Sequence, residues 1–165
     1  MPIPELNHLL EELFAKTWSH LHENTWSHLN NDYAKLPDRP GVYVLAYSDQ
    51  ELARRRVQED EIYYVGVSHR GVLSRLKQFV KGLEDGGHHS GAKRFFRIKA
   101  GKMPYSQLIN RETFFVASAT VPCTYLKKDR TCLDLRKLGV VAALEWYVLA
   151  HIKEKTGREP ELNKK

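Results

Sequence analysis

The sequence predicts one small α/β (α+β) domain, with a short, mostly antiparallel sheet of three strands flanked by helices. The chain has 165 residues, which suits a single domain and is too short for two. Its 42% hydrophobic content is enough for a packed core. Short runs of β-branched and aromatic residues alternate with longer segments whose apolar residues recur at helical spacing. Together these features indicate strands and helices in one folded unit.

The N-terminal segment is predicted to be one amphipathic helix over residues 5–29, because leucines and aromatic residues recur there at helical spacing. The pentapeptide TWSHL occurs twice in it, starting at Thr17 and at Thr25. This repeat distance is slightly more than two helical turns, so the copies lie on nearly one face. We therefore expect residues 1–37 to form a helical extension ahead of the main domain, residues 38–165.

Three strands are predicted in the main domain. The segments over 42–47 and 62–67 are rich in β-branched and aromatic residues, and residues 113–121 repeat this composition before a proline. The connection over 48–61 is highly charged and is predicted to hold a short exposed helix.

Two further helices are predicted from apolar periodicity. The first covers 71–83 and ends before the Gly86-Gly87 pair, and the last covers 138–155 and is capped by Gly157. Between them, the basic and glycine-punctuated segment over 91–102 is predicted to be irregular.

The positive charge is concentrated in the middle of the chain. Lys and Arg outnumber Asp and Glu by 26 to 20, for a formal charge of +6 and a pI near 9.3. Residues 67–111 hold ten bases and two acids, so this segment carries +8 and the rest of the chain −2. Either a solvated face or a surface for the phosphate backbone of a nucleic acid would explain this. The candidate nucleic-acid contacts are Arg70, Lys77, Lys81, Lys93 and Arg94.

Several classes of protein are disfavoured by the sequence. No stretch approaches the roughly 18 apolar residues of a transmembrane helix, and the first residues carry acids where a signal peptide would carry bases. The two cysteines, Cys123 and Cys132, suit a reducing compartment and lack zinc-site spacing. His22-Glu23 begins like a zinc-protease motif, but Trp26 stands where its second histidine would be. We expect a cytoplasmic protein that does not bind a membrane.

Five separate features occur in a specific order in the main domain. Gly41-Val42-Tyr43 opens the first strand and Tyr64-Val65-Gly66 closes the second. Arg75 follows at the start of a helix, Glu145 lies on the last helix, and Asn163 follows Pro160 near the end of the chain. Together these features resemble the GIY-YIG nuclease superfamily, over about residues 38 to 163. The longer connection over 48–61 is a departure from the usual pattern.

The resemblance implies a metal-dependent endonuclease that hydrolyses DNA phosphodiester bonds. Glu145 would be the sole protein ligand of a divalent metal, Mg²⁺ or Mn²⁺, with water and substrate oxygens completing the shell. Arg75 would hold the scissile phosphate. Tyr43 and Tyr64 would flank the attacking water, and one of them would accept its proton. The resemblance leaves open which tyrosine does so.

Supporting roles are implied for other residues. Asn163 would position Tyr43 or the end of the Glu145 helix by hydrogen bonding, and Gly41 and Gly66 would allow close backbone approach at the strand ends. Many members have His or Tyr one turn after the arginine, where this chain has Phe79.

His89 is the alternative proton-transfer group that the sequence offers. It lies in the GGHHSG segment, where some members of the superfamily carry a histidine. It could contact the substrate or the leaving group, or it could be an exposed loop histidine.

Other readings of the same residues remain open. Tyr43 and Tyr64 could be ordinary strand aromatics, and Arg75 could be a cation on a helix surface. The chain could also be a nucleic-acid-binding module that keeps the fold without independent catalysis. A further alternative is a domain that acts only within an assembly, docked on a second copy or on another protein through the apolar stripe of its N-terminal helix.

Overall fold

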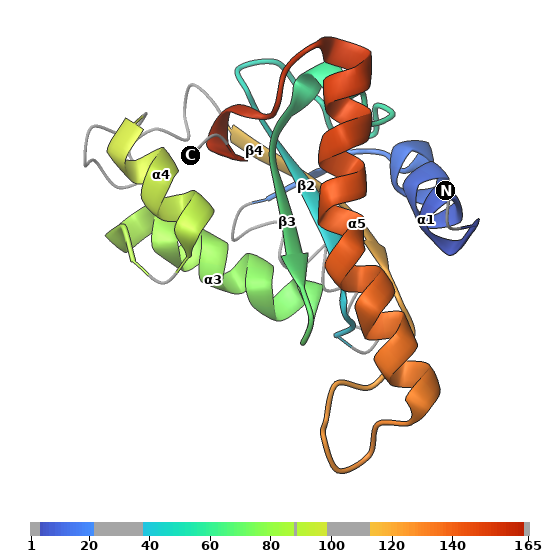
Figure 1. Ribbon diagram of the computed structural model, residues 1–165. Helices are drawn as coiled ribbons and strands as arrows, with labels where there is room; N and C mark the ends of the chain where they lie inside the picture. The colour runs from blue at the N-terminus through green and yellow to red at the C-terminus, as the bar shows by residue number, and fades with distance from the viewer. Residues whose placement is uncertain (1–3, 22–37, 88, 99–112, 164–165) are drawn as a thin grey trace.

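A computed structural model of the chain describes residues 4–21, 38–87, 89–98 and 113–163 (Figure 1). These residues form a four-stranded antiparallel sheet in the order β1-β4-β2-β3, with helices packed against it, so the predicted α+β class is confirmed. The elements follow one another as α1 (Pro4–Ala15), β1 (Ser19–His20), β2 (Gly41–Ser48), η1 (Glu59–Glu61), β3 (Ile62–Ser68), α3 (Val72–Asp85), α4 (Ser90–Ile98), β4 (Thr113–Thr120), α5 (Cys132–Thr156) and η3 (Glu161–Asn163).

Strand β2 is the central strand of the three longer ones. It pairs with β4 along its whole length, from Gly41 opposite Thr120 to Ser48 opposite Thr113, and with β3 on its other edge. Because side chains alternate across a strand, β2 contributes residues to both faces of the sheet. Its first six residues are all buried, as a strand covered on both faces requires.

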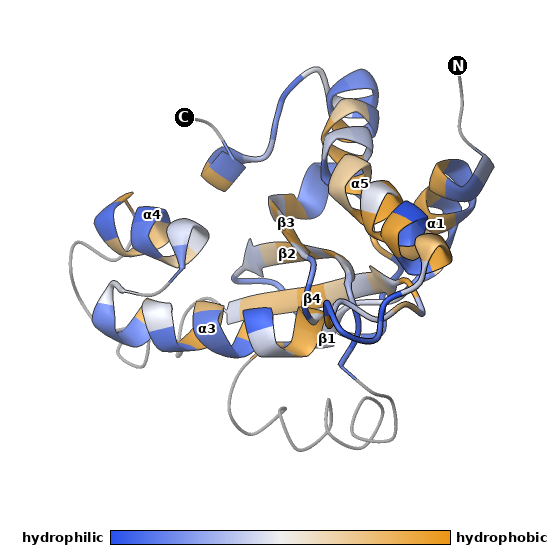
Figure 2. Cartoon of the chain, turned by 60° about the horizontal axis from the view of Figure 1, so that its bottom comes forward, coloured by the Kyte–Doolittle hydropathy of each residue, from blue (hydrophilic) through white to orange (hydrophobic). Residues whose placement is uncertain are grey.

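Two hydrophobic clusters cover the two faces of the sheet. One joins α1 and α5 to β2 side chains such as Val42 and Val44. The other joins α3 and α4 to Tyr43 and Leu45, the alternating residues of the same strand. Figures 1 and 2 show α1 beside α5, and α3 together with α4 on the other side of the sheet. Tyr43 therefore faces α3 and α4.

The predicted helix over 5–29 is wrong beyond Ala15, where α1 ends. Thr17 and Trp18 instead form bridges with Arg56 and Ala53, and β1 then pairs with β4 as a fourth strand. Thr, Trp, Ser and His all have modest helix propensity, so these tertiary contacts outweigh helix extension. The whole second TWSHL copy, residues 25–29, lies outside the described residues.

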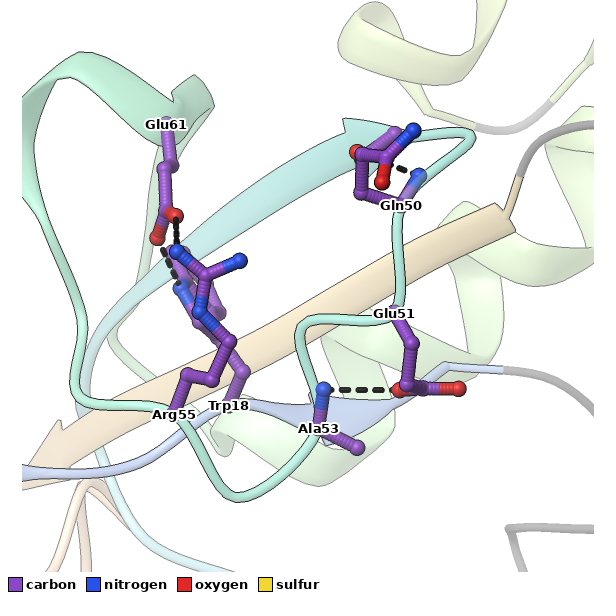
Figure 3. Close-up of polar contacts among 7 residues, drawn as sticks. Trp18, Gln50, Glu51, Ala53, Arg55 and Glu61 are labelled. Carbon is purple, nitrogen blue, oxygen red and sulfur yellow. Dashed lines mark hydrogen bonds and ion pairs between the residues drawn. The ribbon is translucent and has the colours of Figure 1, made fainter.

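The connection over 48–61 is not the short exposed helix that its charges suggested. Within it, only η1 is helical, as a single 3-10 turn. Leu52 and Val57 are almost fully buried in the α1–α5 cluster and hold the segment against the domain. Figure 3 shows the indole of Trp18 and the guanidinium of Arg55 both donating to the Glu61 carboxylate, at 2.8 and 3.0 Å.

Two helices differ from their predicted extents. The basic segment is helical as α4, where it had been predicted to be irregular, because Ala92 and Phe95 pack on α3 and the sheet. Helix α5 begins at Cys132, before the predicted 138, because a reciprocal capping box between Thr131 and Asp134 starts it. Within the described ranges, no helix combines the length and the apolar character needed to cross a bilayer.

Candidate active site

Tyr43 of β2 and Tyr64 of β3 point to the same side of the sheet, with their ring centroids 6.1 Å apart. Both rings rest on glycine. A Cβ atom on Gly66, which pairs with Tyr43 across the strands, would overlap the Tyr43 ring, and one on Gly91 would lie 2.9 Å from Tyr64. Gly41 is equally close to the backbone of β4. Because Gly66 and Gly91 have no side chain, they leave the space that the Tyr43 and Tyr64 rings occupy.

His89 lies directly beside these tyrosines. Its Nε2 is 2.7 Å from the Tyr43 hydroxyl oxygen, and its Nδ1 accepts a hydrogen bond from the Gly91 N–H at 3.1 Å. Because Nδ1 is an acceptor, we assign the proton to Nε2, which donates to Tyr43. The side chain is 1% exposed, so the alternative of an exposed loop histidine is wrong.

The His89 imidazole is held in its neutral form. Burial lowers its pKa to about 3, and the positive charge of Arg75 adds to the effect. Phe79 contacts the ring edge-on, with centroids 5.1 Å apart, and stacks on Tyr64 at 6.0 Å. Phe79 therefore forms the apolar wall of this site, and the loop before α4 supplies the imidazole.

Arg75 reaches the site from the first turn of α3. The start of this helix has no local capping side chain; instead, the Asp38 carboxylate accepts from the backbone N–H groups of Leu73 and Ser74 at 2.8 and 2.9 Å. This remote cap fixes the first turn against the strand that carries Tyr43. The Arg75 guanidinium is half-buried and donates to Gln78 at 2.8 Å.

The two phenols have pKa values raised by their surroundings. Burial raises the pKa of Tyr43 well above its usual range, and to a smaller extent that of Tyr64. Arg75 acts in the opposite direction on both groups, and hydrogen bonds from Ser90 and Tyr43 lower the pKa of Tyr64 further. Both groups are neutral at neutral pH, and Tyr64 is the easier one to ionise.

Glu145 of α5 lies at the edge of the same group of side chains. It is half-buried, burial raises its pKa, and its charge raises the pKa of Tyr64. Among the residues that the structure describes, none donates a hydrogen bond to its carboxylate or forms an ion pair with it. A partly buried carboxylate without a protein partner is a suitable single ligand for a hydrated divalent cation. The described residues hold no cluster of three or more metal-ligating side chains.

Asn163 holds strand β3. The predicted hydrogen bond from Asn163 to Tyr43 or to the end of the Glu145 helix is wrong, because the side-chain amide bonds to Val65 instead. Its Oδ1 accepts from the Val65 N–H and its Nδ2 donates to the Val65 carbonyl, both at 2.8 Å. This paired contact satisfies both backbone groups of Val65 on the outer edge of the sheet. The residue fixed in this way lies between Tyr64 and Gly66.

The predicted nucleic-acid contacts separate into two groups. One group is exposed to solvent: Arg70 just before α3, Lys77 and Lys81 on α3, and Lys93 on α4. Arg94 is instead half-buried and donates to the Leu162 carbonyl at 2.5 Å, so its guanidinium ties α4 to the C-terminal segment. Three further bases of the positive segment, Lys99, Lys102 and Arg111, lie outside the described residues.

Three contributors were missed by sequence reasoning: Asp38, Gly91 and Ser90. The signal for Asp38 was the absence of a capping side chain at Gly71, where α3 begins. Gly91 and Ser90 directly follow His89, and their importance depends on how α4 packs on β3.

The chain was compared with protein-family models, with curated proteins and with solved structures, and no match was found. The candidate site therefore rests on its residues and their geometry.

Proposed function

We propose that this chain is a metal-dependent endonuclease of the GIY-YIG type that hydrolyses DNA phosphodiester bonds. One observation carries the proposal. Tyr43 and Tyr64 lie with their ring centroids 6.1 Å apart, and Arg75 and Glu145 are near enough to influence the pKa of Tyr64. The convergence of these side chains from β2, β3, α3 and α5 supports the proposal.

Arg75 binds the scissile phosphate in this proposal. Its guanidinium is planar and always charged, so it matches two phosphate oxygens at once. The remote cap by Asp38 holds the first turn of α3 in place, which limits the motion of this side chain. The phosphate is thereby fixed beside the two phenols.

Tyr64 accepts the proton of the attacking water, as the phenol that is easier to ionise. Tyr43 supports it: His89 donates to the Tyr43 oxygen, and a hydrogen bond between the two phenols lowers the pKa of Tyr64. Because Tyr64 is neutral at neutral pH, it first releases its own proton to solvent, an ionisation that Arg75 favours and that a cation held by Glu145 would favour further. As the water oxygen then bonds to phosphorus, one water proton moves to the Tyr64 phenolate. The 3′ or 5′ oxygen leaves with the electron pair of the broken P–O bond and takes a proton from solvent.

Glu145 holds the divalent cation, Mg²⁺ or Mn²⁺, in this proposal. A bound cation supplies Lewis-acid stabilisation of the charge that develops on the phosphate and on the leaving oxygen. Its positive charge would also remove the unfavourable effect that the Glu145 carboxylate alone exerts on Tyr64.

The surface around Arg70, Lys77, Lys81 and Lys93 contacts the DNA backbone in this proposal. Such contacts give affinity and salt dependence without reading sequence. The choice of DNA rests on the family resemblance.

Cys123 and Cys132 are both free thiols, which supports a reducing, cytoplasmic location.

The test is a cleavage assay with plasmid, branched and single-stranded DNA in the presence and absence of Mg²⁺. Glu145→Ala is compared with Glu154→Ala, which removes an exposed carboxylate from the same helix. We expect metal-dependent cleavage by the wild type and by Glu154→Ala, and a loss of at least about a hundredfold in Glu145→Ala. Binding without cleavage by the wild type would favour the nucleic-acid-binding module instead, and cleavage by Glu145→Ala at the wild-type rate would contradict the metal role.

A further inference from the structure

Helix α5 presents an apolar stripe on the side that faces away from the core. Its buried residues are Val141, Leu144, Val148 and Ile152. The opposite side of the helix carries a second apolar row whose members are all exposed, and we call it the α5 outer face: Leu135, Gly139, Ala142, Trp146 and Ala150. An apolar row on the solvent side departs from the usual amphipathic surface helix.

Two of the large exposed hydrophobic side chains lie on the α5 outer face: Trp146 is 69% exposed and Leu135 is 49% exposed. Gly139 and Ala142, the members of the row between them, are exposed as well, so the row continues along the helix. Figure 1 shows the start of α5 and its preceding loop standing clear of the sheet. Single exposed apolar residues are ordinary, whereas a contiguous group marks an interaction surface.

Helix α1 borders the α5 outer face at one end. Leu10 of α1 lines a groove together with Trp146, Ala150 and Glu154, whereas the described elements leave the members of the row exposed. The large apolar side chains of α1 pack into the cluster that α1 shares with α5, and all of them are buried except the half-buried Leu10. The exposed apolar row therefore lies on α5 and not on the N-terminal helix.

We propose that the α5 outer face is the interface of a homodimer, in which α5 packs antiparallel to α5 of a second copy. This inference is independent of the proposed nuclease function. The face is self-complementary, because it combines large and small residues in one row. An antiparallel copy sets the partner's Trp146 against Ala142 and the partner's Ala150 against Gly139. A Cβ placed on Gly139 would meet nothing within 4 Å, so there is room above it for a neighbouring helix.

The charges beside the stripe favour a second copy in the antiparallel direction. Arg136 and Glu154 are 18 residues apart, five full turns at 3.6 residues per turn, so they lie on the same flank at opposite ends of α5. Both are exposed, and neither forms a hydrogen bond or ion pair within the part of the chain that the structure describes. A two-fold axis near Glu145 brings Arg136 of each copy beside Glu154 of the other, and a parallel pair would put like charges together.

The first test is the mass of the wild-type protein in solution, measured by light scattering over a dilution series. We expect about twice 19.1 kDa at high concentration and a fall toward 19.1 kDa on dilution. Trp146→Lys and Leu135→Lys replace exposed residues, so the fold should persist, and each should weaken self-association by at least about tenfold. Ile98→Lys is the matched control, because Ile98 is also a large exposed hydrophobic residue, at 53%, but lies on α4.

A charge-reversal series tests the direction of packing. Arg136→Glu and Glu154→Arg should each weaken the dimer, and the double variant should restore it, because the two exchanged charges again oppose each other. A wild type that is monomeric at every concentration overturns the proposal and leaves the face to a protein of different sequence. A dimer that survives Trp146→Lys and Leu135→Lys overturns it as well. Failure of the double variant to recover overturns the antiparallel arrangement.

Discussion

The hydrogen bond between His89 and Tyr43 is the contact on which the candidate site depends most closely at the scale of single residues. Its length is 2.7 Å, and both partners are almost fully buried. The second imidazole nitrogen is occupied by the Gly91 N–H, so the ring cannot take a proton without breaking that bond. A histidine held in this state keeps its donor directed at Tyr43 throughout the neutral pH range.

A stability measurement against pH tests this assignment. The pKa of His89 in the folded protein, about 3, lies below the value of 6.5 expected when the chain is unfolded. Between these values only the unfolded chain binds the proton, so the free energy of unfolding falls as pH decreases below about 6.5. Where the unfolded chain binds one more proton than the folded protein, this group lowers the free energy of unfolding by about 1.4 kcal/mol for each pH unit of acidification.

His89→Gln removes the titrating group and keeps an amide that can bond to Tyr43. Urea unfolding of both proteins at several pH values between about 7 and 4 should show a smaller pH dependence for the variant, by close to one proton. Equal slopes would mean that His89 is charged or exposed in the folded protein.

Strand β3 illustrates how short elements position the site. It is an edge strand, and its outer side is paired with the Asn163 side chain instead of another strand. The 3-10 turn η3 therefore acts as a clamp on the strand that carries Tyr64. Arg94 strengthens the clamp by donating to the Leu162 carbonyl from α4.

Asn163→Ala should lower the free energy of unfolding by about 2 to 3 kcal/mol, because two hydrogen bonds are lost and both backbone groups of Val65 lose their partner. The measurement is urea unfolding at neutral pH. Gln58→Ala removes an exposed amide that makes no side-chain cap bond, and it should change stability by less than about 0.5 kcal/mol. A loss in Asn163→Ala no larger than in this control would show that the clamp contributes nothing.

The sequence predicts those elements whose local signal agrees with their environment. Strands β2 and β4, for example, have strong β-propensity and are buried where they lie. The failures occur where tertiary contacts decide. Trp18 leaves the helical pattern because its indole reaches Glu61, and α4 forms because Phe95 packs under Tyr47 and Phe114.

The candidate site follows the same division. Tyr43, Tyr64, Arg75 and Glu145 belong to regular elements, so their order along the chain was enough to single them out. The burial of His89 could not be predicted, because it depends on a short loop being covered by Phe79 and α4. The hydrogen-bond partner of Asn163 could not be predicted either, because Val65 lies 98 residues away in the sequence.

In the whole molecule, the proposed DNA-binding surface and the proposed dimer interface lie on different sides of the sheet. The positive residues on α3 and α4 lie on one side of the sheet, and the α5 outer face lies on the other. A dimer formed through α5 would therefore leave the α3–α4 side of each copy free for a nucleic acid. The two proposals are compatible, and each can fail without the other.

The salt dependence of DNA binding tests the positive side. If Lys77 and Lys81 both contact phosphates of duplex DNA, removing them together should reduce the slope of log K against log salt by about 1.8, at about 0.9 per contact. The control is the double variant Lys127→Ala/Lys128→Ala, which removes two exposed lysines from the loop before α5. Filter binding at four or five salt concentrations gives both slopes. Equal losses in the two variants would contradict a localised DNA surface.

Single-turnover DNA cleavage in Mg²⁺ is the decisive test of whether Arg75 and its neighbours form one hydrolytic site. The wild type is compared at saturating protein with Arg75→Ala and with Arg158→Ala, which removes an exposed arginine after α5. We expect cleavage by the wild type and by Arg158→Ala at similar rates, and a loss of at least about a hundredfold in Arg75→Ala. No metal-dependent cleavage by the wild type, or an Arg75→Ala rate equal to that of Arg158→Ala, would contradict a hydrolytic site at Arg75.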